Sequence, residues 1–142
     1  MTIEAYLESL RGRTVAVIGA GVSNTPLIRL LRQGGVAVTV RDKKSREALG
    51  PLAGELEALG CALRLGEDYL AGVTEDVVFR TPGLHPKFLE EARRRGSVIT
   101  SEMEAFFEVC PCPIVGVTGS DGKTTTTTII SELLKAAGRN VY

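Results

Sequence analysis

The stretch Thr14-Val-Ala-Val-Ile-Gly-Ala-Gly-Val-Ser-Asn24 decides the fold, because an apolar run ends there in a glycine-rich turn. Residues 14–18 have the β-branched, apolar composition of a buried strand. A helical pattern follows over about residues 25–33, with Pro26 in its first turn, where the missing N–H does no harm. The stretch therefore predicts a strand, a tight turn and a helix in succession.

The same alternation continues along the chain to residue 109. This alternation of apolar strand-like runs with helical patterns predicts an α/β fold with an open parallel sheet covered by helices. Further strands are expected at residues 36–40, 61–65, 76–80 and 97–100, and further helices at 46–59, with a break at Gly50-Pro51, and at 87–95 and 102–109.

Composition excludes several classes of protein. The apolar fraction of 44% and the charged fraction of 24% are those of an ordinary soluble globular protein. Seventeen basic residues balance seventeen acidic ones, so no net field favours nucleic acid or an anionic membrane. The N-terminus lacks the features of a signal peptide, and no apolar run is long enough to span a bilayer. Three cysteines form neither a disulfide framework nor a four-ligand zinc pattern, so a cytoplasmic protein with reduced thiols is expected.

Three loops follow the carboxyl ends of predicted strands, where ligands bind in open parallel sheets. In the first, Gly19-Ala20-Gly21 allows the backbone to approach a diphosphate closely. In the second, Asp42 lies about 20 residues further on, where a carboxylate often binds a ribose hydroxyl or a nucleobase. The third is the turn at 81–83. The candidate ligand-binding residues are Gly19, Ala20, Gly21, Val22, Ser23, Asn24, Asp42, Lys43, Lys44, Thr81, Pro82 and Gly83.

Taken alone, these loops leave alternatives open. The first is close to a dinucleotide-binding pattern, but Asn24 stands where that pattern has a third glycine. A plain strand-to-helix turn explains Gly19 and Gly21 equally simply, and Asp42 could be a solvated loop acid. The turn at 81–83 has a functional meaning only together with the other two loops.

A second glycine-rich segment follows a break in regular structure. Two prolines in Pro111-Cys112-Pro113 favour an extended linker, and we place a domain boundary there. Beyond it we expect a buried strand at 114–117, a phosphate-binding loop, a helix to about Ala137 and the start of another strand at 141–142. Residues 1–110 would then form one domain, and residues 111–142 only the beginning of a second.

The phosphate-binding loop departs from the strict Walker spacing, because five residues separate Gly116 from Gly122 and two separate Gly119 from Gly122. Its place between a strand and a helix still favours a nucleoside triphosphate, with Lys123 near the phosphates and a threonine hydroxyl on Mg²⁺. The candidate ATP-binding residues are Gly119, Ser120, Asp121, Gly122, Lys123, Thr124 and Thr125, with Thr124 as the Mg²⁺ ligand.

The two glycine loops, their order and their separation resemble those of the Mur ligases of peptidoglycan synthesis. The resemblance covers essentially the whole chain. The phosphate loop followed by threonines is rather specific to these ligases, whereas the first glycine loop is not. It is carried by residues 17–23, 40–42, 81–83 and 98–104 and by the segment Gly116-Val-Thr-Gly-Ser-Asp-Gly-Lys-Thr124.

This resemblance implies a three-domain cytoplasmic enzyme of cell-wall biogenesis, and hence of cell shape and division. A Rossmann-like first domain holds the UDP of a sugar nucleotide, a central domain binds ATP, and a third brings in the amino acid. Within the family the chain looks most like the ligase that joins D-glutamate to UDP-N-acetylmuramoyl-L-alanine through an acyl phosphate. The candidate residues before Thr100 would hold the UDP-sugar, and Lys123 would neutralise the β- and γ-phosphates of ATP.

The chain also departs from the family pattern. Thr81 stands where the family more often has serine, and Lys43 where it has a small hydroxyl residue. The magnesium-binding carboxylate, the modified lysine and the D-glutamate site would all lie beyond Tyr142. We therefore expect the chain to bind UDP-sugar but not to turn over by itself.

Two other functions remain possible from the sequence. The first is an NAD-dependent oxidoreductase domain built on Gly19, Gly21 and Asp42, against which Asn24 and the phosphate loop argue. The second is a non-catalytic module that binds a sugar nucleotide.

Overall fold

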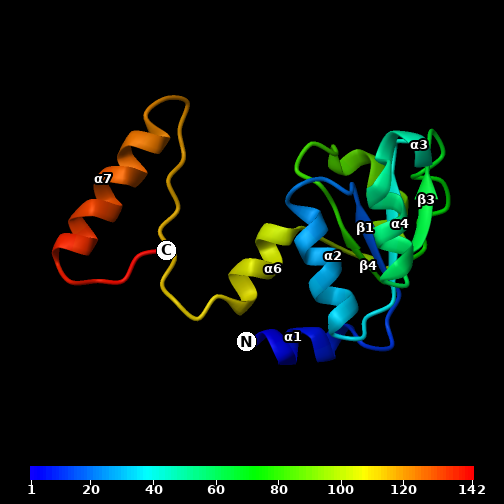
Figure 1. The fold of residues 1–142 in the computed structure, drawn as a ribbon, viewed down its shortest axis with the longest axis horizontal. Coiled ribbons are helices and arrows are strands. Elements are labelled where there is room, and N and C mark those ends of the chain that lie inside the picture. The colour runs from blue at the N-terminus through cyan, green and yellow to red at the C-terminus, as the bar shows by residue number, and fades with distance from the viewer. The chain divides into compact units, whose positions relative to one another are not determined.

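The computed structural model describes residues 1–142, which form two compact units, Met1–Pro111 and Cys112–Tyr142. In the larger unit the strands are β1 (Val15–Ile18), β2 (Val38–Asp42), β3 (Ala62–Leu65), β4 (Val77–Phe79) and β5 (Val98–Thr100). Its helices are α1 (Ile3–Leu10), α2 (Asn24–Gln33), α3 (Arg46–Leu49), α4 (Pro51–Ala58), the short 3₁₀ helix η1 (Pro86–Leu89), α5 (Glu90–Arg94) and α6 (Glu102–Val109) (Figure 1).

The sheet is entirely parallel, and its strands lie in the order β3-β2-β1-β4-β5. β1 lies at the centre and pairs with β2 on one side and β4 on the other. The order changes direction at β1, which makes the carboxyl edge beside it the usual ligand position in such a sheet. The predicted α/β fold with an open parallel sheet and flanking helices is confirmed, and the arrangement is Rossmann-like.

Side chains alternate between two apolar layers, as the pleat of a strand requires. One layer packs α1, α2, α4 and α6 against the sheet, and Figure 1 shows α2 and α4 in front of the strands. The other is smaller and is covered by the segment between β3 and β4, by η1 and by α5. Strand residues of the larger layer include Val15, Val17, Val38, Val40 and Phe79, and those of the smaller layer are Ala16, Ile18 and Val78.

Strand and helix bounds differ from the predictions by a few residues, for local reasons. β2 begins at Val38 and not at residue 36, because the N–H of Val36 donates to the carbonyl of Leu31 and closes the end of α2. The helix at 46–59 is divided at Gly50, whose φ of 58° lies in the left-handed region. The segment at 87–95 begins as η1 before it becomes α5.

α1 was not predicted. The Thr2 hydroxyl caps it by accepting the Ala5 N–H at 3.2 Å, and Leu7 and Leu10 are buried on one face. Leu7 packs closely against Gly34 at the end of α2, since a Cβ added at Gly34 would lie 2.8 Å from a Leu7 methyl carbon.

The smaller unit contains one helix, α7 (Lys123–Ala136), close to the predicted bounds. The strands predicted at 114–117 and 141–142 are wrong, because these residues have no strand structure and Ile114 and Val115 are exposed. A strand needs a partner for its N–H and C=O groups, and this unit contains no other strand that could provide one.

Candidate functional site

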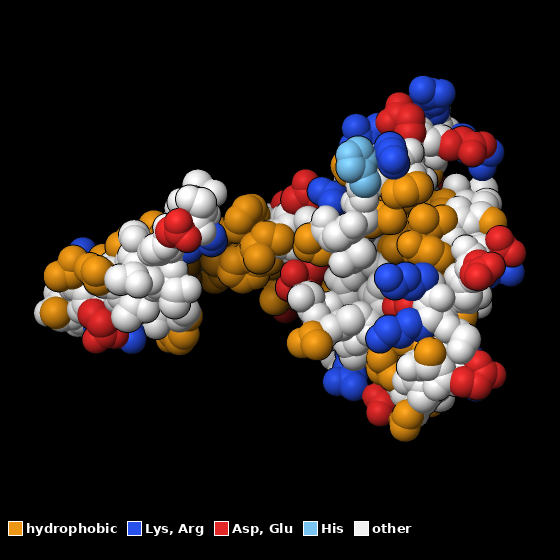
Figure 2. Space-filling view, turned by 90° about the horizontal axis from the view of Figure 1, so that it is seen from above, with side chains coloured by type: hydrophobic (Ala, Val, Ile, Leu, Met, Phe, Trp, Pro, Cys, Tyr) orange, Lys and Arg blue, Asp and Glu red, His pale blue; other side chains and the backbone are white.

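A cavity of about 230 Å³ lies at the carboxyl edge of the sheet, beside β1. It brings together all three of the predicted loops: Gly19 follows β1, Asp42 and Lys43 come from the end of β2, and Thr81 and Gly83 follow β4. Figure 2 views this edge from above and shows basic side chains beside an exposed apolar area. The remaining lining residues are Ile18, Tyr69 and Leu84.

The first loop is fixed by Asp42, which is only 8% exposed. One carboxylate oxygen accepts the Ala20 N–H and the other accepts the Lys44 N–H, both at 2.8 Å. The Gly19 N–H donates to the Arg41 carbonyl at 2.7 Å, so the end of β2 holds the loop twice. A carboxylate has about four lone pairs, so Asp42, which also lines the cavity, can accept further hydrogen bonds besides those from the two N–H groups.

Asn24 occupies the position of the third glycine and has a structural reason to be there. Its side-chain amide is buried and donates to the carbonyls of Ile18 and Gly19, each at 3.0 Å. It therefore ties the first turn of α2 to the end of β1. A glycine could not make these bonds, so the loop is held more rigidly than a plain glycine turn.

Gly19 has a φ of 88°, a backbone conformation that other L-residues rarely adopt. A Cβ added there would also lie 3.6 Å from the Thr81 side chain, so the first and third loops approach each other closely. The position thus requires glycine for its backbone and keeps the cavity mouth open beside Thr81.

The other predicted residues lie around this cavity without lining it. Ala20 and Asn24 are buried beneath the loop, while the remaining ones lie at the exposed rim. The rim residues are Gly21, Val22, Ser23, Lys44 and Pro82. Val22 is 96% exposed and makes no packing contribution.

Two features of the site were missed by sequence reasoning. Tyr69 follows β3 and lines the cavity, and Arg41 forms a buried ion pair with Glu75 immediately beneath this segment. The position of Tyr69 after a parallel strand was an available signal, because all such ends meet at one edge. The ion pair gave none, since Arg41 and Glu75 are far apart in the chain.

The second glycine loop, in the smaller unit, is exposed throughout. Gly119 and Gly122 have φ values of 149° and 74°, and Gly122 is the N-cap of α7. The Lys123 ammonium donates to the carbonyls of Gly119 and Ser120, at 2.5 and 3.1 Å, so the loop curves around it. Ser120, Asp121, Thr124 and Thr125 are exposed beside it.

The structure has no group of three or more His, Cys, Asp or Glu side chains that could hold a metal ion by themselves. None of its helices combines the length and the apolar character needed to cross a membrane.

The chain is similar in sequence to known ligases. No family model matches the chain. It is 48% identical over 141 residues to the UDP-N-acetylmuramoylalanine–D-glutamate ligase of Clostridium botulinum (strain Okra / Type B1), with 96% of this chain covered. To the enzyme of the same name from Clostridium novyi (strain NT) it is 47% identical over 144 residues, with 99% covered. In both cases the chain spans 31% of the length of the relative.

Two solved structures of peptide ligases are also similar to this chain in fold. A murein peptide ligase from Psychrobacter arcticus matches with a TM-score of 0.54 and 26% identity, and a pseudomurein peptide ligase type C from Methanothermus fervidus with 0.55 and 26%. Each match covers 89% of this chain and 27% of the other. The chain is a homologue of the N-terminal portion of UDP-N-acetylmuramoylalanine–D-glutamate ligases.

Proposed function

We propose that this chain is the sugar-nucleotide-binding portion, with the first part of the ATP-binding domain, of a ligase that adds D-glutamate to UDP-N-acetylmuramoyl-L-alanine. The observation that carries the proposal is the meeting of three strand-end loops in one cavity, in a chain 48% identical to such ligases over 141 residues. The larger unit would bind the UDP-sugar, and residues 111–142 would begin the ATP-binding domain.

The first loop suits a diphosphate. Gly19 and Gly21 bring backbone close to the ligand, and the loop leads directly into the N-terminus of α2, whose dipole favours negative charge. Lys43 lines the cavity and Lys44 lies at its rim, so both ammonium groups can approach the bound anion. Asp42 and Thr81 would contact the uridine end.

The second loop would hold the phosphates of ATP. Lys123 would exchange its bonds to loop carbonyls for the β- and γ-phosphate oxygens, and residues 119–125 would surround them. The hydroxyl of Thr124 suits Mg²⁺, which prefers oxygen ligands, and the ion would neutralise phosphate charge when bound.

In the proposed reaction, a carboxylate oxygen of the L-alanyl group attacks the γ-phosphorus of ATP, and ADP leaves. The amine of D-glutamate then attacks the acyl phosphate carbon, phosphate leaves, and the nitrogen loses a proton to give the amide. This chemistry needs chiefly positioning and charge stabilisation. Nothing in the larger unit has to act as a nucleophile.

Calorimetric titration of the 142-residue chain tests the proposal. UDP-N-acetylmuramoyl-L-alanine should bind, and Asp42→Ala should weaken binding by about 1–3 kcal/mol, because buried hydrogen bonds and the shape of the first loop are lost. Lys123→Ala should leave this affinity unchanged, since its loop would serve ATP.

A loss of UDP-ligand binding in both variants would contradict the division into two sites. NADH provides the control ligand. Saturable micromolar binding of NADH that UDP-N-acetylmuramoyl-L-alanine does not displace would replace the ligase proposal by the dinucleotide alternative.

A further inference from the structure

Tyr69 is the only aromatic residue that lines the cavity. It is half-buried, and its ring packs against the smaller apolar layer of the sheet. The segment that precedes Tyr69 is bonded to the end of β2. The Gly66 N–H donates to the carbonyls of both Asp42 and Lys44, at 3.0 and 3.2 Å. The Tyr69 N–H in turn donates to the Gly66 carbonyl. The ring thus forms one wall of the cavity, and the backbone that carries it is bonded to the end of β2.

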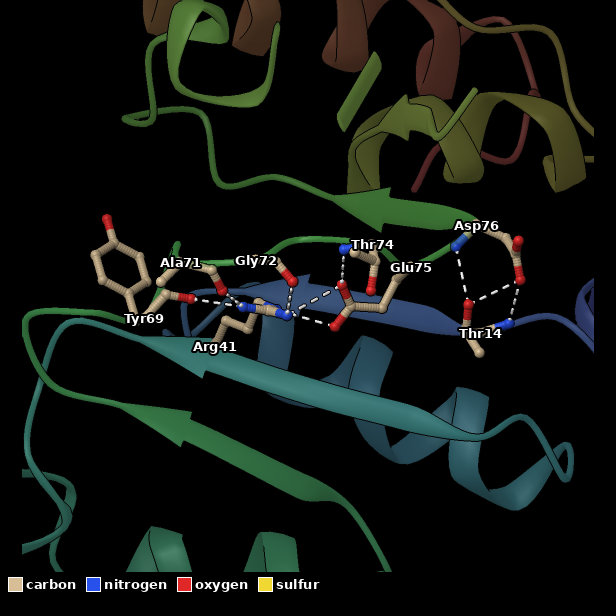
Figure 3. A network of polar contacts seen from close by, with 8 residues as sticks. All are labelled: Thr14, Arg41, Tyr69, Ala71, Gly72, Thr74, Glu75 and Asp76. Carbon is tan, nitrogen blue, oxygen red and sulfur yellow. Dashed lines mark hydrogen bonds and ion pairs between the residues drawn. The ribbon is translucent and has the colours of Figure 1, made fainter. Parts of the chain in front are cut away.

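The main support of this wall is Arg41. Its Nε and one terminal nitrogen donate to the two carboxylate oxygens of Glu75, at 2.9 and 3.1 Å. The guanidinium also donates to three backbone carbonyls of the segment that begins with Tyr69. These are the carbonyls of Tyr69, Ala71 and Gly72, at 3.0, 3.0 and 3.2 Å (Figure 3).

Arg41 therefore uses all five of its N–H groups on one segment. Arg41 is 4% exposed and Glu75 7%, so the pair is shielded from water. A buried ion pair of this kind contributes little net stability compared with apolar residues of similar volume. What it does provide is a fixed geometry for the backbone of residues 69–75.

Successive residues at the end of β2 thus organise two walls of one cavity. Side chains alternate across a strand, so Asp42 holds the glycine loop on one face while Arg41 holds the Tyr69 segment on the other. The glycine loop suits phosphate, as argued above. The aromatic wall suits the flat, uncharged part of the same ligand.

We propose that Tyr69 is a ligand-binding residue that packs its ring against the pyrimidine base of the nucleotide, and that Arg41 is the residue that positions it. The proposal rests on the proposed function, which brings a uridine nucleotide to this cavity. Its volume of about 230 Å³ is small for a whole sugar nucleotide, since pockets for drug-sized ligands start at roughly 300 Å³. It suits a base with its ribose, and the rest of the ligand would extend along the rim.

The test uses UDP, with pyrophosphate as the ligand that lacks a base. Tyr69→Leu should weaken UDP binding about 5- to 150-fold, the range that corresponds to base–aromatic stacking energies, and should leave pyrophosphate binding unchanged. Tyr69→Phe retains the ring and should stay within about threefold of the unmodified chain, because the expected contact is made by the ring face.

Arg41 is tested through its effect on Tyr69. The double variant Arg41→Met/Glu75→Leu removes both charges together, which avoids an unpaired buried charge. It should weaken UDP binding to the same extent as Tyr69→Leu, and combining the two should cost little more, because both remove the same contact. The matched control is Arg46→Met/Glu57→Leu, which removes an exposed ion pair that does not line the cavity and should leave UDP binding unchanged.

A nuclear Overhauser contact between the Tyr69 ring protons and H5 or H6 of uracil, measured in the unmodified chain, requires no variant to fold. Its absence from the bound complex would overturn the proposal. So would UDP binding that Asp42→Ala weakens and Tyr69→Leu does not, which would leave the proposed function intact. Additive losses would overturn the positioning role of Arg41, and failure of the unmodified chain to bind UDP would overturn both proposals.

Discussion

The two glycine loops of this chain differ in how the surrounding structure supports them. The loop after β1 is held by the buried Asp42 and Asn24 and joins a central strand to a packed helix. The loop before α7 follows an exposed, irregular segment, and α7 has no buried residue. The loop before α7 is the less supported of the two in the structure, but it carries the more specific sequence motif.

The difference separates two kinds of information in a sequence. The segment ending in Lys123 specifies a ligand chemistry through residue types at fixed spacing. The segment ending in Asn24 specifies a structure, because its residues bond to each other and to the end of β2. A motif can therefore be easy to recognise where the local fold is weakly supported, and hard to recognise where it is strong.

The largest expected contrast between the units is in stability. Phe79 is fully buried in β4, so Phe79→Ala should lower the free energy of unfolding of the larger unit by about 3–5 kcal/mol. The matched change in α7, Leu133→Ala, removes a side chain that is 66% exposed and should cost less than about 0.5 kcal/mol. Urea denaturation followed by circular dichroism measures both, and equal losses would show that α7 is packed in solution.

The next contrast is between the loops themselves. Asn24→Ala leaves the Ile18 and Gly19 carbonyls without their donor and should lower the free energy of unfolding by about 1–3 kcal/mol. Asn140→Ala, at an exposed position near the C-terminus, is the control and should have no measurable effect. If Asn24→Ala also left the free energy of unfolding unchanged, the stability of the glycine loop would not depend on the Asn24 side-chain amide.

Low pH should destabilise the sheet at the amino ends of its strands, where Asp76 lies. The Thr14 N–H and hydroxyl donate to the Asp76 carboxylate at 2.7 and 2.8 Å, and these bonds lower the pKa of Asp76 in the folded chain. The stability that they contribute is complete above the unfolded pKa of about 3.9 and is lost as the pH falls through the lower folded pKa. The thermal midpoint should therefore fall less steeply below about pH 4 in Asp76→Asn than in the unmodified chain, and identical slopes would contradict this role.

The smallest effect concerns α7. The Thr127 hydroxyl donates to the carbonyl of Lys123 within the helix, and threonine is a poor helix former. Because burial does not support α7, Thr127→Ala should increase its stability by up to about 0.7 kcal/mol. Helical ¹³Cα shifts of residues 123–136 report this directly, and unchanged shifts would mean that factors other than propensity decide whether α7 forms.

Much of the larger unit was predictable from sequence because its strands are apolar and its turns contain glycine or proline. α1 was not predicted, although Thr2 provides an N-terminal cap and Leu7 and Leu10 provide an apolar face. In the smaller unit, the apolar run at 114–117 has the composition of a strand but lacks a neighbour to pair with. Composition predicts the preference of a segment, and pairing decides whether it becomes a strand.

The candidate site shows the same limit. The three loops could be predicted because parallel strands share one edge, and their residues were named from their place after each strand. Tyr69 follows β3 by a few residues and was open to the same reasoning. The bonds between Arg41 and residues 69–75 depend on which face of β2 each side chain occupies, and no local pattern specifies that pairing.

The opposite charges of Arg41 and Asp42 at the end of β2 also disfavour pairing of this strand in a shifted register. A shift of one residue in its pairing would exchange the two faces of the strand. Asp42 would then be directed toward the carboxylate of Glu75, and the Arg41 guanidinium would meet the N–H of Ala20, which now donates a hydrogen bond to Asp42. Both mispaired contacts would be repulsive, so a single dipeptide rejects the slipped sheet as well as organising the correct one.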